Sequence, residues 1–227
     1  MNYVKFRGVS THDIGVLVDT MPPHKKPPMR YTEYVVQGKN GSMHTEEGYD
    51  AFDLPVTCTM FRQNATARDA INAWADGTGQ LVTSDMPDRC WMASVLRPVD
   101  YQRREYGKYY DKFTVTFRCQ PIMREVVPTV QTFTKNGVIA NLGDVIAHPL
   151  IVVEGAGDVE FSIAGQTIIL HNVTENVTID SEAGYVYTAS GAVSMIGEFP
   201  VLPLGESNIT IVKGVVRLNI TPNWGWL

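Results

Sequence analysis

The most informative stretch of the chain is Arg30-Tyr-Thr-Glu-Tyr-Val-Val-Gln-Gly-Lys-Asn-Gly-Ser-Met43. It begins with aromatic and β-branched residues that favour a strand, and it reaches Asn40-Gly41, a pair that strongly favours a hairpin turn. Both residues tolerate the positive φ that a type I′ turn requires at its two central positions. We therefore predict a β-hairpin over Tyr31–His44 with its turn at Asn40-Gly41.

Further strands are predicted on the C-terminal side of this hairpin. Apolar residues alternate with smaller or polar ones in two segments, at residues 54, 56, 58 and 60 and at residues 113, 115, 117 and 119. Such alternation is typical of strands with one buried face. Residues 81–96 are interpreted as a strand, a turn at Pro87-Asp88 and a second strand, since proline and aspartate favour turns.

One helix is predicted in the whole chain. Thr66 is a suitable N-cap, Asp69 favours the positive end of the helix dipole, and Gly77 supplies the C-terminal stop. Residues 67, 70, 71 and 74 fall on one apolar face at helical spacing. A single short helix among strands has to bury that face against a sheet, so we expect Trp74 to be a packing residue.

From Pro149 onward the sequence predicts strands only. Gly and Asn turns such as Gly155-Ala156-Gly157 separate short β-rich runs, a pattern typical of a β-sandwich. These runs are residues 150–154, 159–163, 167–170, 177–180, 185–188, 192–196, 208–212 and 215–221.

Charge divides the chain in the same place as the predicted elements. Residues 1–124 hold 16 Lys/Arg and 14 Asp/Glu, whereas residues 125–227 hold 3 Lys/Arg and 10 Asp/Glu. We therefore predict a mainly β protein with two modules, residues 1–128 and residues 129–227. The first is a β-sandwich or β-sheet module with the helix and the hairpin, and the second is a β-sandwich. Neither half has the dense basic patch of a nucleic-acid-binding protein.

Residues that could carry out chemistry are scattered. Cys58, Cys90 and Cys119 lie far apart in apolar or alternating runs, which favours core positions over a disulfide or metal site. The five histidines show no metalloprotease spacing, and no nucleophile elbow or complete phosphate loop is present. The acidic pair Glu46-Glu47 is interpreted as solvated rather than as a glycosidase dyad. We predict no enzyme, no catalytic residues, no cofactor and no metal.

The N-terminus has no apolar signal-peptide region, and no apolar run approaches the ~18 residues that cross a membrane. These features predict a soluble protein made in a cytoplasm, with no membrane partner.

The order of several motifs resembles the distal tail protein family of long-tailed, siphovirus-type bacteriophages and prophages. Over nearly the whole chain, the matching motifs are Phe6-Arg7-Gly8-Val9-Ser10-Thr11, Gly38-Lys39-Asn40-Gly41-Ser42, Ala73-Trp74-Ala75-Asp76-Gly77, Pro87-Asp88-Arg89-Cys90-Trp91, the Phe113–Pro121 strand, Asn208-Ile209-Thr210-Ile211 and Thr221-Pro222-Asn223-Trp224. The chain departs from the family in having Gly225 where the family ends in Arg.

This resemblance implies a structural virion protein: a six-membered ring that forms the hub at the distal end of the tail. The ring joins the tail-tube protein to tip or baseplate proteins, and DNA passes through its channel only in transit. The N-terminal module forms the ring through its hairpin, and the C-terminal module is a galectin-like β-sandwich. The expected contact residues are Tyr31, Tyr34, Val36, Lys39 and Met43. The expected location is the virion tail tip, after assembly in the host bacterial cytoplasm.

Two other functions remain open at this point. The C-terminal sandwich could serve as a carbohydrate-binding or adhesion module, for which Tyr185, Tyr187, Trp224 and Trp226 are the candidate platform residues. Alternatively, the chain could be a tail-tube subunit, which stacks into long tubes rather than closing into one ring.

Overall fold

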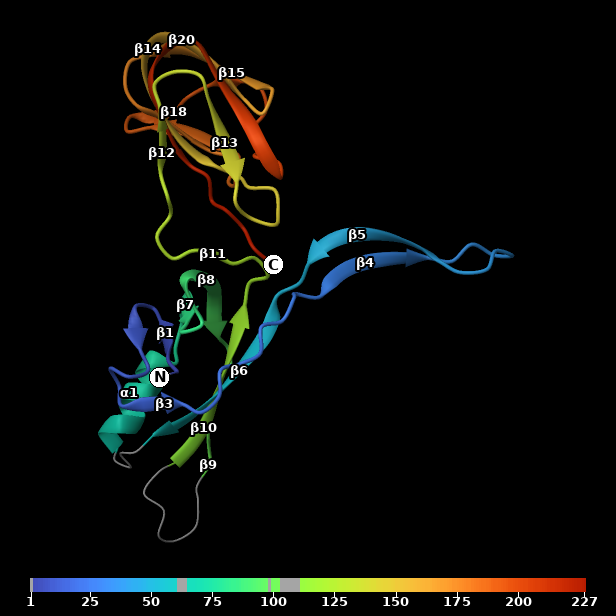
Figure 1. Ribbon diagram of the computed structural model, residues 1–227, viewed down its shortest axis with the longest axis vertical. Helices are drawn as coiled ribbons and strands as arrows, with labels where there is room; N and C mark the ends of the chain where they lie inside the picture. The colour runs from blue at the N-terminus through green and yellow to red at the C-terminus, as the bar shows by residue number, and fades with distance from the viewer. Residues whose placement is uncertain (1, 61–64, 98, 103–110) are drawn as a thin grey trace. The chain divides into compact units, whose positions relative to one another are not determined.

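The computed structural model describes residues 2–60, 65–97, 99–102 and 111–227. They form a mainly β protein with one short helix, which confirms the predicted fold class (Figure 1). The chain divides into two compact units: residues 1–126 together with Leu227 form unit 1, and residues 127–226 form unit 2.

Unit 1 is built on an antiparallel sheet whose strands follow the order β2-β1-β7-β8-β10-β6-β3, with β11 paired to β8 and β9 paired to β10. The strands of this sheet are β1 (Val4–Phe6), β2 (Val9–Ser10), β3 (Val16–Val18), β6 (Phe52–Met60), β7 (Thr78–Thr83), β8 (Met86–Val95), β9 (Asp100–Gln102), β10 (Asp111–Cys119) and β11 (Arg124–Glu125).

The two alternating strands predicted from the sequence form the centre of this sheet. β6 and β10 pair along their whole length, from Asp111 opposite Met60 to Cys119 opposite Phe52. Their alternate apolar side chains are buried, as the periodicity predicted. All three cysteines are free and buried, also as predicted.

The helix α1 (Ala65–Trp74) covers the apolar interior of unit 1. Trp74 packs edge-to-face against Phe6 and Phe117, with ring centroids 6.3 and 5.9 Å away, and its indole Nε1 donates to the Val9 carbonyl at 3.0 Å. Trp74 is therefore a packing residue, as expected. Gly77 follows the helix with φ 78° and ends it. The predicted N-cap is wrong, because Thr66 lies inside the helix.

The turn predicted at Pro87-Asp88 is also wrong. The hairpin between β7 and β8 turns at Ser84-Asp85, and Thr83 pairs with Met86. Pro87 lies inside β8, where the register with β7 shifts between Leu81 and Thr83. A proline without an N–H is tolerated there because no regular ladder bond needs its donor.

Unit 2 has a second antiparallel sheet with the order β12-β20-β14-β16-β17-β18, to which β13, β15 and β19 add pairs off the main path. Its strands are β12 (Gln131–Phe133), β13 (Gly137–Asn141), β14 (Leu150–Ile163), β15 (Gln166–Val173), β16 (Val177–Asp180), β17 (Tyr185–Thr188), β18 (Gly191–Ala192), β19 (Met195–Ile196) and β20 (Gly205–Thr221).

Two long strands, β14 and β20, each replace a pair of predicted short ones. The glycines at residues 155, 157 and 214 are not turns between strands but bulges within them, where the register of β14 against β20 shifts. A Cβ on Gly155 would lie 2.4 Å from the Gly214 carbonyl oxygen, so the two backbones approach too closely for any side chain there.

Candidate assembly surface on the β4–β5 hairpin

The segment that opened the sequence analysis forms a two-stranded sheet of its own, β4 (Met29–Tyr34) and β5 (Met43–Tyr49). Residues 29–49 are called the arm below, and residues 34–43 the arm tip. Figure 1 draws the arm as a ribbon that leaves unit 1 beside the start of β6 and extends away from its sheet. Most of its residues are exposed, so the arm is held by its own two strands and not by a core.

The hairpin is confirmed, but its predicted turn is wrong. The ladder ends at Tyr34 opposite Met43, which leaves an eight-residue loop instead of a two-residue one. Within that loop the Lys39 amide donates to the Val36 carbonyl at 3.1 Å, and Gly38 has φ 82°. This pattern is that of a type II turn centred on Gln37-Gly38. Asn40 does not have the positive φ that a type I′ turn requires.

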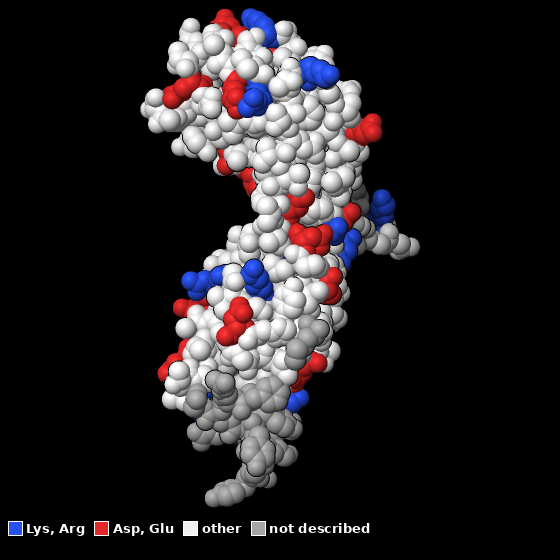
Figure 2. All heavy atoms as spheres, turned by 60° about the vertical axis from the view of Figure 1, so that its left-hand side comes forward, with Lys and Arg blue, Asp and Glu red and all other residues white. Residues whose placement is uncertain are grey.

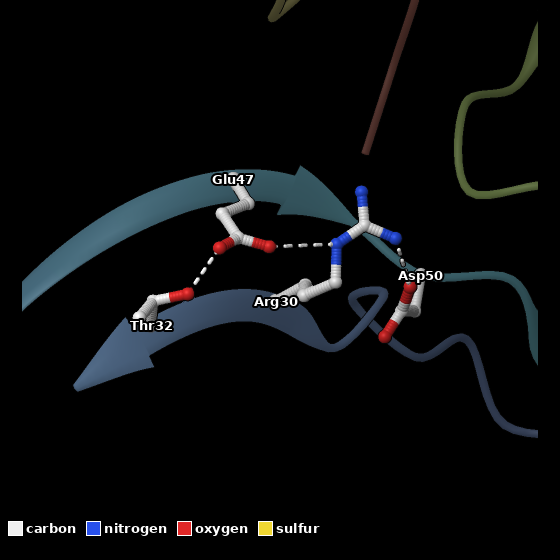
Figure 3. A network of polar contacts seen from close by, with 4 residues as sticks. All are labelled: Arg30, Thr32, Glu47 and Asp50. Carbon is white, nitrogen blue, oxygen red and sulfur yellow. Dashed lines mark hydrogen bonds and ion pairs between the residues drawn. The ribbon is translucent and has the colours of Figure 1, made fainter.

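A bulge near the base gives the arm a polar anchor. Arg30 pairs with Gly48 and Tyr31 with Glu46, so Glu47 is the extra residue on β5, next to Gly48 at φ 120°. The displaced Glu47 carboxylate faces the neighbouring strand β4 (Figure 3).

Three contacts form this anchor. Glu47 Oε2 lies 3.3 Å from Arg30 Nε and its other oxygen accepts from the Thr32 hydroxyl, while Arg30 Nη1 lies 3.1 Å from Asp50 Oδ1 (Figure 3). The Asp50 amide also donates to the Pro28 carbonyl at 2.8 Å. Sequence reasoning interpreted Glu46-Glu47 only as solvated residues; the signal for the bulge was the glycine that follows them.

The five expected contact residues all lie on the arm and point outward. Tyr31, Tyr34, Val36 and Met43 are 58%, 55%, 47% and 58% exposed, and Val35, which the sequence analysis did not select, is 78% exposed. Lys39 is exposed in the loop. Antiparallel partners share a face, so Tyr34 and Met43 lie together on one face while Tyr31 lies on the other, 6.0 Å from the His44 ring.

This arrangement combines an apolar surface with unpaired backbone. Both strands of a two-stranded sheet are edges, so each has a row of N–H and C=O groups that face no partner strand. Exposed apolar side chains next to such an edge are typical of a surface that another chain covers.

The rest of the described chain offers few alternatives. Trp224 and Trp226 are buried, so of the four candidate platform residues only Tyr185 and Tyr187 are exposed; their ring centroids lie 5.3 Å apart. Among the described residues, no group of three or more His, Cys, Asp or Glu could hold a metal. Within the same ranges, no helix is long and apolar enough to span a bilayer. On the face in Figure 2, charged side chains are scattered among uncharged ones.

Comparison with known proteins gives one family. Residues 11–119 match the family described as phage tail protein RIFT-related domain. No curated protein matches the chain. The crystal structure of the SPP1 Dit protein, described as a paradigm of the hub adsorption apparatus in phages that infect Gram-positive bacteria, matches 100% of both chains with a TM-score of 0.79 and 15% identity.

Two further structures are more distant. Chains of the phage P2 baseplate in its activated conformation, with Ca and with Sr, each match with a TM-score of 0.44 and 10% identity over 97% of both chains. At that TM-score the likeness supports no inference.

Proposed function

Residues 11–119 belong to the phage tail protein RIFT-related domain family, and from this premise we propose that the chain forms a closed ring at the distal end of a phage tail. The motif-based resemblance to the distal tail proteins is confirmed by this family and by the fold shared with SPP1 Dit over both chains. The protein is thus a structural component of a phage tail. We further propose that each ring has six copies and that DNA passes through its channel.

The exposed arm is the observation that carries this proposal. A monomer that exposes Tyr31, Tyr34, Val35, Val36 and Met43 beside two unpaired strand edges leaves apolar area in contact with water. Burial of that area stabilises an assembly by about 25 cal/mol per Å². Each added ladder hydrogen bond contributes about 1 kcal/mol, so apolar burial and not backbone pairing dominates the affinity.

The charge distribution agrees with a tail hub. Residues 1–124 carry a net charge of +2 and residues 125–227 a net charge of −7, so neither half attracts a polyanion strongly. DNA that passes such a ring is not retained by it. We infer that unit 2, which exposes Val138, Leu142, Leu204, Val212 and Val216, meets the tip or baseplate proteins. Its galectin-like character belongs to the same proposal.

Ring formation is tested on the purified full chain by light scattering with size-exclusion chromatography and by negative-stain imaging. We expect closed rings of six. The same measurements are made on a variant in which residues 35–42 are replaced by Asn-Gly. This replacement connects Tyr34 to Met43 through a short type I′ turn. We expect this variant to keep the fold of unit 1, because the arm lies outside its core, and to remain monomeric.

The matched control is Val138→Asp, which adds a charge at an exposed apolar residue of unit 2 and should leave the rings intact. Long tubes would instead favour the tail-tube function. A wild-type chain that stays monomeric at high concentration would refute the ring.

A further inference from the structure

Unit 1 also has a groove between α1 and the loop that links β2 to β3, and one part of it is mainly apolar. It is hollowed in two adjoining parts of about 480 and 300 Å³ that share Ile14 and Ala70. Arg7, Val9, Ala73 and Trp74 line the smaller part, and His12 and Asp13 line the larger one. Sequence reasoning assigned no role to this surface.

Three polar side chains that line the groove already have partners. Asp13 Oδ2 accepts from the Ser10 amide at 2.9 Å, His12 Nε2 lies 3.2 Å from the Asn2 carbonyl oxygen, and Arg7 Nη1 donates to the Asp76 carbonyl at 2.8 Å. The apolar floor has no such cover, since Val9 is 40% exposed and Ala73 is also exposed. In the smaller part of the groove, where Val9 and Ala73 lie, a ligand therefore gains most from apolar side chains.

The groove and the arm lie at opposite ends of β6. The arm precedes Phe52, the first residue of β6, whereas Val16, next to the loop 12–15, pairs with Met60, the last one. Nine residues of strand separate these ends by about 27 Å. In Figure 1 the arm also extends away from the side on which α1 lies. The arm therefore points away from the groove of its own chain.

We propose that the groove of one copy receives the arm tip of the next copy. The tip has two exposed apolar side chains, Val35 and Val36, that can cover the apolar floor of the groove. Its backbone turns tightly at Gln37-Gly38. Lys39 is the only charged residue between Tyr34 and Met43. Among the described lining residues, Asp13 lies in the larger part of the groove and Arg7 in the smaller part, so Lys39 has an opposite charge at the larger part only. The apolar tip residues therefore fit the smaller part, and Lys39 fits the larger one.

A contact between two different patches is heterologous, and repetition of such a contact closes a ring or extends a filament. This inference rests on the proposed function and adds the acceptor to it. It differs from pairing of one arm edge with another arm edge, a contact that needs no groove.

A mixing experiment separates these arrangements. Val36→Asp places a charge in the apolar tip and leaves the groove unchanged. Ala73→Arg fills the groove with a long side chain and leaves the tip unchanged. Each variant alone is expected to sediment as a monomer with an unchanged circular dichroism spectrum. When the two variants are mixed, the native tip of the Ala73→Arg chain can bind the native groove of the Val36→Asp chain. We therefore expect a 1:1 heterodimer by sedimentation velocity. The control Asp69→Arg places the same side chain on an exposed part of α1 outside the groove, and it should keep the rings.

A cross-link gives an independent readout in intact rings. The double variant Val35→Cys with Ala73→Cys should form disulfides between neighbouring chains on mild oxidation, giving a ladder of linked chains on a non-reducing gel. The native thiols are buried and do not compete. The pair Val35→Cys with Val138→Cys should give only background linkage.

The outcomes distinguish the two proposals. Wild-type rings together with a mixture that stays monomeric, or with cross-linking no better than the control pair, overturn the groove as acceptor and leave the ring standing. If the wild-type chain forms no ring, the proposed function itself fails.

Discussion

At the scale of single residues, the buried cysteines show how the core changes acid–base chemistry. Burial raises the pKa of the Cys58 thiol to about 12, with a smaller contribution from the Asp19 carboxylate. Burial also raises the pKa of Cys119 to about 12, where Asp53 adds to the effect and Arg118 opposes it. Both thiols start from an ordinary pKa of 9.0, so in the folded protein they stay protonated above the pH at which a solvent-exposed thiol ionises.

This predicts a loss of stability in alkali. Between pH 9 and 12 the unfolded chain releases both thiol protons while the folded chain keeps them, so stability falls as pH rises. At pH 10 each thiol accounts for about 1 kcal/mol of this loss. Thermal unfolding at pH 8 and pH 10 measures it. The double variant Cys58→Ala with Cys119→Ala should lose less stability between the two pH values; an equal loss would contradict the prediction.

Glycine residues of unit 2 permit a second residue-scale test. Gly214 has φ 72°, and a Cβ there would lie 2.2 Å from the Asp158 carbonyl oxygen. Gly157 has φ 73° but open space around it. Gly157→Ala therefore costs only backbone strain, about 1 kcal/mol. Gly214→Ala adds a steric clash of about 1–3 kcal/mol. Urea unfolding should rank the two variants in that order, and equal midpoints would show that the bulge relaxes freely.

At the scale of elements, sequence periodicity predicted what lies within strands better than where strands end. The alternation in β6 and β10 predicted the buried face of both strands, because a period of two follows from the pleat itself. The strand ends predicted at residues 155–157 and 213–214 were wrong, because β14 and β20 continue through these positions. Glycine there serves a close approach between two long paired strands, and local sequence does not distinguish that use from a turn.

The arm shows the same limit on prediction. The stretch Arg30–Met43 predicted the hairpin and placed all five expected contact residues on it. It did not predict the turn at Gln37-Gly38 or the bulge at Glu47, because the ladder register depends on which residues pair across the two strands. The groove was not predicted at all, since it is lined by segments that are far apart in the sequence.

The anchor at the base of the arm gives an element-scale prediction. Glu47→Ala removes the carboxylate that joins Arg30 and Thr32. The Arg30 and Glu47 side chains are about half exposed, so the pair contributes at most about 1 kcal/mol and global stability should hardly change. Local opening of the arm should increase, because no core holds it. Hydrogen exchange should therefore become faster in residues 29–34 and 43–49.

A matched control is Glu33→Ala, which removes an acidic side chain from the same hairpin outside the anchor. Unchanged exchange in both variants would mean that backbone pairing alone orders the arm. A large drop in melting temperature for Glu47→Ala would instead show that the arm is coupled to the core of unit 1.

At the scale of the whole molecule, the two units have separate buried cores. Phe6 and Phe117 lie in the core of unit 1, whereas Phe161 and Ile220 lie in that of unit 2. Separate cores favour separate unfolding transitions. If ring contacts belong to unit 1 alone, only unit 1 gains stability from assembly.

The last prediction follows by mass action. Association that requires folded unit 1 stabilises this unit in proportion to the logarithm of the protein concentration, whereas unit 2 gains nothing. Differential scanning calorimetry over a range of concentrations should resolve two transitions, of which only one moves upward with concentration. Gly214→Ala assigns the stationary transition to unit 2, because it lowers that transition alone. The variant with residues 35–42 replaced by Asn-Gly should abolish the concentration dependence of the other. If both transitions rise with concentration, ring contacts extend to unit 2 and the arm is not sufficient to form them.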